Sequence, residues 1–126
     1  MKKQIDVKAI VDEYKKIGPL AEKTLWSGDY KAGNRYAARM LKLYKLFEND
    51  LSAARSIVSE LMNNSDSTYL KIIGATYSLV LGIFVDDASN ILQEIEQNSD
   101  NALCKLNAEY TLKEWRNGTL VVYHKK

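Results

Sequence analysis

Apolar residues recur along the chain at the spacing of α-helices. The first stretch places its apolar residues at i, i+3, i+4, i+7 and i+10, on one helical face: Val7, Ile10, Val11, Tyr14 and Ile17. The following Gly18 and Pro19 predict a break, because proline lacks a backbone N–H and its ring clashes with the preceding turn. A short helical segment is expected to follow at residues 20–26.

Longer helical stretches follow, each bounded by capping residues, glycines or polar loops. Asp29 is a candidate N-cap, and Gly82 and Gly118 stand where later helices are expected to end. The expected helices cover residues 29–47, 51–62, 69–80, 86–97 and 101–115, with polar loops at 63–67 and 98–100. The pattern predicts an all-α protein.

The chain also repeats itself. A shift of 33 residues aligns Tyr44 with Tyr77 and Tyr110 and brings the loops into register. The same shift aligns Met40 with Ile73 and Leu106, Ala37 with Leu70 and Leu103, and Leu46 with Leu79 and Leu112. A two-helix unit of this length is typical of α-solenoids, in which neighbouring helical pairs complete each other's core.

The repeat predicts a short α-α superhelix, a HEAT-like α-solenoid with a repeat of about 33 residues. We expect a single domain over residues 1–126, with capping helices at 1–28 and repeats at 29–118. Residues 119–126 are expected to form an extended C-terminal tail that folds back along the last helix.

Composition agrees with a globular helical protein. Among 126 residues, 46% are hydrophobic and 27% charged, and one proline and six glycines favour long helices over many tight turns. The N-terminus becomes polar after its first residue and lacks the apolar stretch of a secretory signal. No apolar run approaches the ~18 residues of a membrane span. A cytoplasmic protein without a membrane partner is therefore expected.

No catalytic site is apparent in the sequence. His124, the only histidine, is close to the C-terminus, and Cys104, the only cysteine, is expected to be a buried thiol. Neither a glycine-rich phosphate loop nor a Cys/His metal spacing occurs. We therefore expect a non-enzymatic protein with no catalytic residues, no metal and no cofactor.

The charge is distributed unevenly. Residues 1–62 hold 12 Lys/Arg against 8 Asp/Glu, a net +4, whereas residues 63–118 hold 4 against 8, a net −4. The acidic part offers a candidate docking surface for a basic partner, although a solvated surface would have the same composition. Its candidate residues are Asp66, Asp86, Asp87, Glu94, Asp100 and Glu109. The Asp86-Asp87 pair also suits a helix start, where the macrodipole favours anions.

Two other groups of side chains are candidates for binding. Trp26 is a possible interface anchor, because tryptophan is enriched in binding hot spots, while packing at the end of the fold is the alternative. A basic stripe at i, i+4, i+8 and i+11 lies opposite the apolar face of the helix at 29–47: Lys31, Arg35, Arg39 and Lys42. Such a stripe can bind nucleic acid, or can be an ordinary solvated face that pairs with neighbouring acids.

Several motifs resemble a bacterial family of short α-α superhelical, HEAT-like proteins of unknown function. They are Gly28-Asp29-Tyr30-Lys31-x-x-Asn34-Arg35, Ala75-x-Tyr77-x-Leu79 and Ala108-x-Tyr110-x-Leu112-x-x-Trp115-x-x-Gly118. The resemblance covers residues 5–118, and its motifs fall at caps and packing positions.

Families similar to this one include immunity proteins of bacterial toxin systems, among them contact-dependent growth inhibition. The resemblance thus implies a cytoplasmic immunity protein that binds a cognate toxin domain, such as a nuclease, in a one-to-one complex. A HEAT-like adaptor that binds some other protein would have the same sequence features. Nucleic acid is not the expected partner.

Overall fold

A computed structural model describes residues 4–123 of the chain. Within this range the chain forms six α-helices and no β-strand. They are α1 (Val7–Ser27), α2 (Tyr30–Phe47), α3 (Leu51–Asn63), α4 (Thr68–Leu81), α5 (Val85–Asn98) and α6 (Ala102–Arg116). The expected all-α class is confirmed, and the last five helices begin and end within one residue of the predicted bounds.

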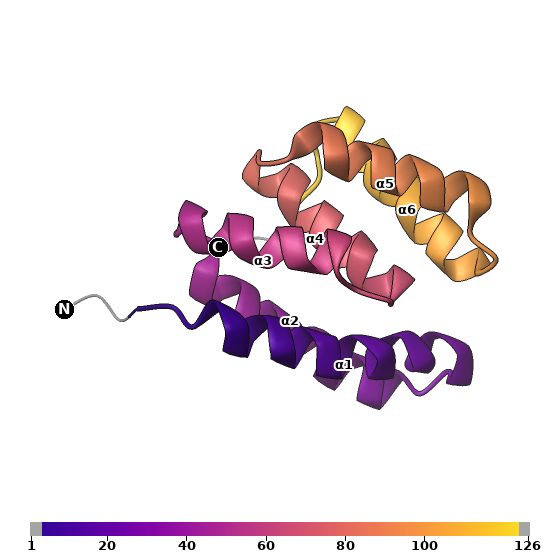
Figure 1. Cartoon of the computed structure of the whole chain (residues 1–126). Coiled ribbons are helices and arrows are strands. Elements are labelled where there is room, and N and C mark those ends of the chain that lie inside the picture. The colour runs from indigo at the N-terminus through magenta and orange to yellow at the C-terminus, as the bar shows by residue number, and fades with distance from the viewer. Residues whose placement is uncertain (1–3, 124–126) are drawn as a thin grey trace.

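The helices pair in chain order and the pairs are stacked. α1 packs with α2, α3 with α4 and α5 with α6, and the α3/α4 pair lies between the other two (Figure 1). α4 is the central helix, since it contacts α1, α3, α5 and α6. The loops that precede α2, α4 and α6 lie at one end of this stack (Figure 1).

Capping side chains fix where the helices begin. Asp29 accepts a hydrogen bond from the backbone N–H of Ala32 at 3.1 Å, which satisfies one of the free donors of the first turn. Asp6, Asp50, Ser67 and Asn101 cap α1, α3, α4 and α6 in the same way. The predicted N-cap at Asp29 is confirmed.

The first helix corrects one prediction, because α1 continues through Gly18 and Pro19. A Cβ atom added at Gly18 would lie 2.4 Å from Cγ of Leu70, so the glycine allows α1 and α4 to approach closely. Pro19 is exposed and removes a single helical hydrogen bond. The segment 1–28 therefore contains one helix in place of the expected capping helices.

An aromatic cluster forms the centre of the core and joins α1, α2 and α4. Among the rings of Tyr14, Tyr44, Phe47 and Tyr77, the contacting pairs have centroids 4.6 to 6.5 Å apart. The hydroxyl of Tyr14 donates to the carbonyl oxygen of Met40 at 2.9 Å and lies 3.1 Å from the hydroxyl of Tyr77. Burial raises the pKa of Tyr14 and of Tyr77, and raises the pKa of Tyr44 to about 12.

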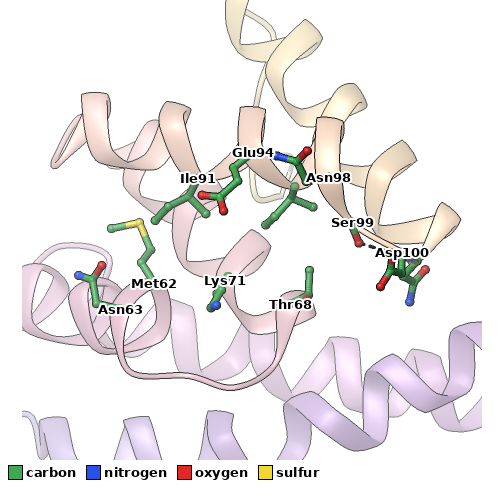
Figure 2. A pocket seen from close by; sticks show the side chains of 11 residues that line it. Met62, Asn63, Thr68, Lys71, Ile91, Glu94, Asn98, Ser99 and Asp100 are labelled. Atoms are coloured by element: carbon green, nitrogen blue, oxygen red, sulfur yellow. Dashed lines mark hydrogen bonds between the residues drawn. The ribbon is translucent and has the colours of Figure 1, made fainter.

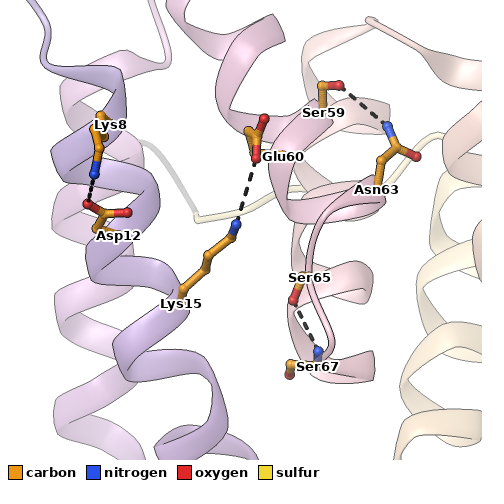
Figure 3. A network of polar contacts seen from close by, with 8 residues as sticks. All are labelled: Lys8, Asp12, Lys15, Ser59, Glu60, Asn63, Ser65 and Ser67. Carbon is orange, nitrogen blue, oxygen red and sulfur yellow. Dashed lines mark hydrogen bonds and ion pairs between the residues drawn. The ribbon is translucent and has the colours of Figure 1, made fainter.

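Polar contacts outside the core also tie the first helix to the rest of the molecule. Nζ of Lys15 on α1 lies 3.7 Å from Oε2 of Glu60 on α3, an ion pair drawn in Figure 3. The carboxylate of Glu22 accepts a hydrogen bond from the backbone N–H of Tyr69 at 3.2 Å, at the start of α4. The Glu22 contact holds the end of α1 next to the N-terminus of α4, and the Lys15–Glu60 pair joins the middle of α1 to α3.

Burial follows the predicted repeat at only some aligned positions: Leu79 and Leu112 are 6% and 0% exposed, but Leu46, which aligns with them, is 61% exposed. Tyr44 and Tyr77 are 2% and 6% exposed, whereas Tyr110 is 62% exposed, so the expected third core position is wrong. Leu106, which aligns with the buried Met40, is also exposed. α6 instead buries Cys104, Ala108 and Leu112, because only one side of this last helix meets other helices.

The C-terminal segment corrects another prediction. Residues 119–123 are neither helix nor strand, and residues 121–123 lie next to α2 and α4 rather than along α6. The hydroxyl of Tyr123 donates to Oε2 of Glu48 at 2.6 Å, and its ring packs edge-on against Tyr44 of α2. The ammonium of Lys45 lies 4.7 Å from the centre of the same ring. The segment therefore crosses to α2 and covers part of the aromatic cluster.

Candidate functional site

A polar groove of about 540 Å³ lies where the α3/α4 pair meets α5 (Figure 2). Its floor is formed by apolar side chains of α3 and α5, and its walls carry amides, hydroxyls and charges. It is lined by Met62, Asn63, Thr68, Lys71, Ile91, Glu94, Ile95, Asn98, Ser99, Asp100 and Asn101. Concave surfaces of this composition suit polar or charged groups of a partner.

The groove contains two of the predicted acidic residues, Glu94 on α5 and Asp100 in the loop after it. Both are exposed, and neither has an ion pair or a side-chain hydrogen bond to another residue among 4–123. Lys71, which also lines the groove, forms no ion pair in the same range. The two carboxylates are thus available to a basic group of a partner.

Backbone contacts hold the loop that carries Asp100. The hydroxyl of Ser99 accepts a hydrogen bond from the N–H of Asn101 at 3.1 Å. The side chain of Asn101 accepts from the N–H groups of Leu103 and Cys104 at 2.9 and 3.1 Å. The loop is fixed by the cap of α6, and the Asp100 side chain projects from it without an internal partner.

The other predicted acids do not belong to one surface with these two. Asp66 is exposed in the α3–α4 loop, next to the groove residue Thr68, and precedes the N-cap of α4. Asp86 and Asp87 occupy the first turn of α5, about 20 Å along that helix from Asp100. Their position fits the helix-start role. Glu109 is exposed on α6 and does not line the groove.

Trp26 is 62% exposed at the end of α1, so the alternative of packing at the end of the fold is not found for this ring. The turn that follows it lies at the same end of the stack as the loops with Asp66 and Asp100 (Figure 1). Tyr30, 82% exposed in the first turn of α2, was not predicted as a site residue and lies just past this turn. Trp115, by contrast, packs against the core.

The basic stripe on α2 is partly neutralised. The guanidinium of Arg39 forms two hydrogen bonds to the carboxylate of Glu13 on α1, one of them at 2.8 Å. These contacts lower the pKa of the Glu13 carboxyl. Lys31, Arg35 and Lys42 are exposed and form no ion pair within residues 4–123.

Cys104 is buried, as predicted, and burial raises the pKa of its thiol to about 11. A carboxylate oxygen of Glu22 lies 3.9 Å from its sulfur and disfavours the thiolate further. In the part of the chain that the structure describes, no three His, Cys, Asp or Glu side chains are placed to hold a metal ion. His124 lies outside the described residues.

Comparison with known proteins adds no relative. No family model, no curated protein and no solved structure matches the chain. None of the helices within residues 4–123 combines the length and the apolar character needed to cross a membrane. The resemblance noted in the sequence stays a prediction.

Proposed function

We propose that this chain is a cytoplasmic immunity protein, which binds a cognate bacterial toxin domain and neutralises it by direct contact. The observation that carries the proposal is the groove with Glu94 and Asp100, two exposed carboxylates without partners inside the described chain. A nuclease is the expected kind of toxin domain, because its nucleic-acid-binding surface is basic and complements these carboxylates.

The end of the stack next to the groove supports this proposal. Trp26 and Tyr30 are the kinds of residue that dominate the energetics of protein interfaces, and both are largely exposed there. An aromatic anchor at the same end of the stack as unpaired acids would bind a surface that presents both a hydrophobic pocket and lysine or arginine side chains. The complex is proposed to be one-to-one and of standard interface size, roughly 1,600 Å² in total.

We also infer that the three stacked pairs form a short α-α superhelix of the HEAT-like kind. The order of the pairs and the central position of α4 support it, as do the aligned tyrosines of α2 and α4. The exposed position of Tyr110 departs from the regular repeat at α6.

The test is survival on co-expression with a candidate toxin domain encoded by a neighbouring gene. Cells that make both proteins should grow, whereas the double substitution Glu94→Lys/Asp100→Lys should abolish protection, because it places positive charge against a basic domain. Asp86→Lys/Asp87→Lys is the matched control: it changes the net charge equally at exposed positions outside the groove and should protect like the wild type.

Death of the cells with the wild-type chain would refute the immunity proposal. Recovery of a different protein with this chain, in a manner abolished by the groove substitutions, would replace it with the adaptor alternative. Tight binding of nucleic acid at physiological salt, lost on Arg35→Glu, would instead favour the basic stripe.

A further inference from the structure

The last helix is apolar on two opposite faces. Cys104, Ala108 and Leu112 face the core and are 1%, 0% and 0% exposed. The opposite face bears Leu103, Leu106 and Tyr110 at i, i+3 and i+7, which are 38%, 60% and 62% exposed. We call these three residues the outer face of α6. A helix that is apolar on both sides is ordinarily covered on both sides.

The equivalent residues of α4 are covered in this way. Leu70, Ile73 and Tyr77 precede the three outer residues by 33 positions. Leu70 packs against Gly18 of α1, and the ring of Tyr77 packs against Tyr14 of α1 and Tyr44 of α2. In α4 these positions therefore meet the α1/α2 pair, whereas the aligned residues of α6 are left exposed by the described chain.

The charges beside the outer face favour a second copy of the chain over a strongly charged partner. Lys105, Glu109 and Lys113 alternate in sign at intervals of four residues along α6. The charged side chains of α5, by contrast, are all acidic. An alternating row is complementary to itself when two helices run antiparallel, whereas α5 is complementary to a partner of opposite sign.

We propose that two copies of this chain associate about a two-fold axis through the outer faces of their α6 helices. With the helices antiparallel and the axis crossing the outer face midway between Leu106 and Tyr110, Leu106 of one copy packs beside Tyr110 of the other, and the reverse contact follows by symmetry. Glu109 of one copy then comes within reach of Lys105 of the other. The contact leaves the groove between the α3/α4 pair and α5 free, and it is independent of the proposed function.

The contact area of one helix face is smaller than that of a standard interface, so the association is weak, on the order of 10–100 μM. Sedimentation velocity of the full chain from roughly 5 to 300 μM measures it directly. The mass should rise with concentration from 14.3 kDa toward twice that value. Leu106→Glu and Tyr110→Glu should each raise the dissociation constant about tenfold or more, because they bury charge in the contact.

Leu46→Glu is the matched control, since Leu46 on α2 is 61% exposed against 60% for Leu106 and lies on another pair of the stack. It should leave the association unchanged. Circular dichroism of each variant checks that the helices are retained. A monomer at every concentration would overturn the proposal, as would equal weakening by Leu46→Glu and Leu106→Glu.

Discussion

At the scale of single residues, burial separates tyrosines that the sequence makes equivalent. The hydroxyls of Tyr14 and Tyr77 are satisfied inside the core, and no buried side-chain polar atom among the described residues lacks a hydrogen-bond partner. A hydroxyl that is desolvated stabilises the fold only while its partner remains, because an unpaired buried donor or acceptor is costly. The aromatic cluster therefore depends on these hydrogen bonds as well as on hydrophobic packing.

Tyr77→Ala should lower the free energy of unfolding by about 3–5 kcal/mol, because it removes a ring packed against three other aromatic side chains. Urea denaturation followed by circular dichroism measures the change. Tyr110→Ala serves as the control at the aligned position and should leave the unfolding midpoint unchanged, since Tyr110 is largely exposed. Equal destabilisation by the two substitutions would mean that Tyr110 is buried as Tyr77 is, as the regular repeat predicts.

Stability should decline at alkaline pH. Burial raises the pKa of the Cys104 thiol from 9.0 to about 11 and that of Tyr44 from 10.0 to about 12. Groups whose pKa is raised on folding contribute stability that is present below the unfolded pKa and is lost as pH rises toward the folded pKa. Urea unfolding between pH 8 and 11 should show this fall, and Cys104→Ala should flatten it between pH 9 and 11. An unaltered slope in that variant would show that Cys104 does not contribute.

At the scale of elements, the sequence predicted the helices well where caps and glycines mark their ends. Asp29 and Gly82 stand at the borders of helices, and the structure places them there. Gly18 and Pro19 carry the same local signal but lie inside α1, because Leu70 from a distant helix requires the glycine. Local pattern alone cannot distinguish a glycine that ends a helix from one that accommodates a neighbour.

Gly18→Ala distinguishes these two roles. Helix propensity alone would make alanine more favourable by about 1 kcal/mol. The close contact with the buried Leu70 side chain should outweigh this gain and destabilise the protein by about 1–3 kcal/mol. Chemical denaturation gives the sign of the change in the free energy of unfolding. Adding Leu70→Ala to the Gly18→Ala variant should remove the penalty caused by the alanine methyl group. A stabilised single variant would show that α1 and α4 separate easily.

The C-terminal segment should stabilise the fold through Tyr123. Tyr123→Ala removes the hydrogen bond to Glu48 and the ring contact with Tyr44, and should lower the urea midpoint. Tyr123→Phe keeps the ring and should cause a smaller loss. A midpoint equal to that of the wild type in both variants would mean that this segment is not held against α2 in solution.

At the scale of the whole molecule, the sequence supplied the candidate residues but could not group them. Asp86 and Asp100 appear together in an acidic half, yet α5 holds them at opposite ends. The groove depends on how the α3/α4 pair meets α5, and Asn98 and Lys71 lining it carry no signal in the sequence. The repeat predicted Tyr110 in the core, but the structure exposes it on the outer face of α6.

The most direct test of the proposed function is the affinity of the purified chain for a candidate toxin domain encoded by a neighbouring gene, measured by calorimetry. The wild type should bind one-to-one with a nanomolar dissociation constant. Glu94→Lys/Asp100→Lys should weaken binding about a hundredfold or more, because it opposes like charges across the contact. Asp86→Lys/Asp87→Lys should bind like the wild type. Equal affinities for the groove variant and the wild type would contradict the proposed binding surface, and no binding by the wild type would contradict the immunity function.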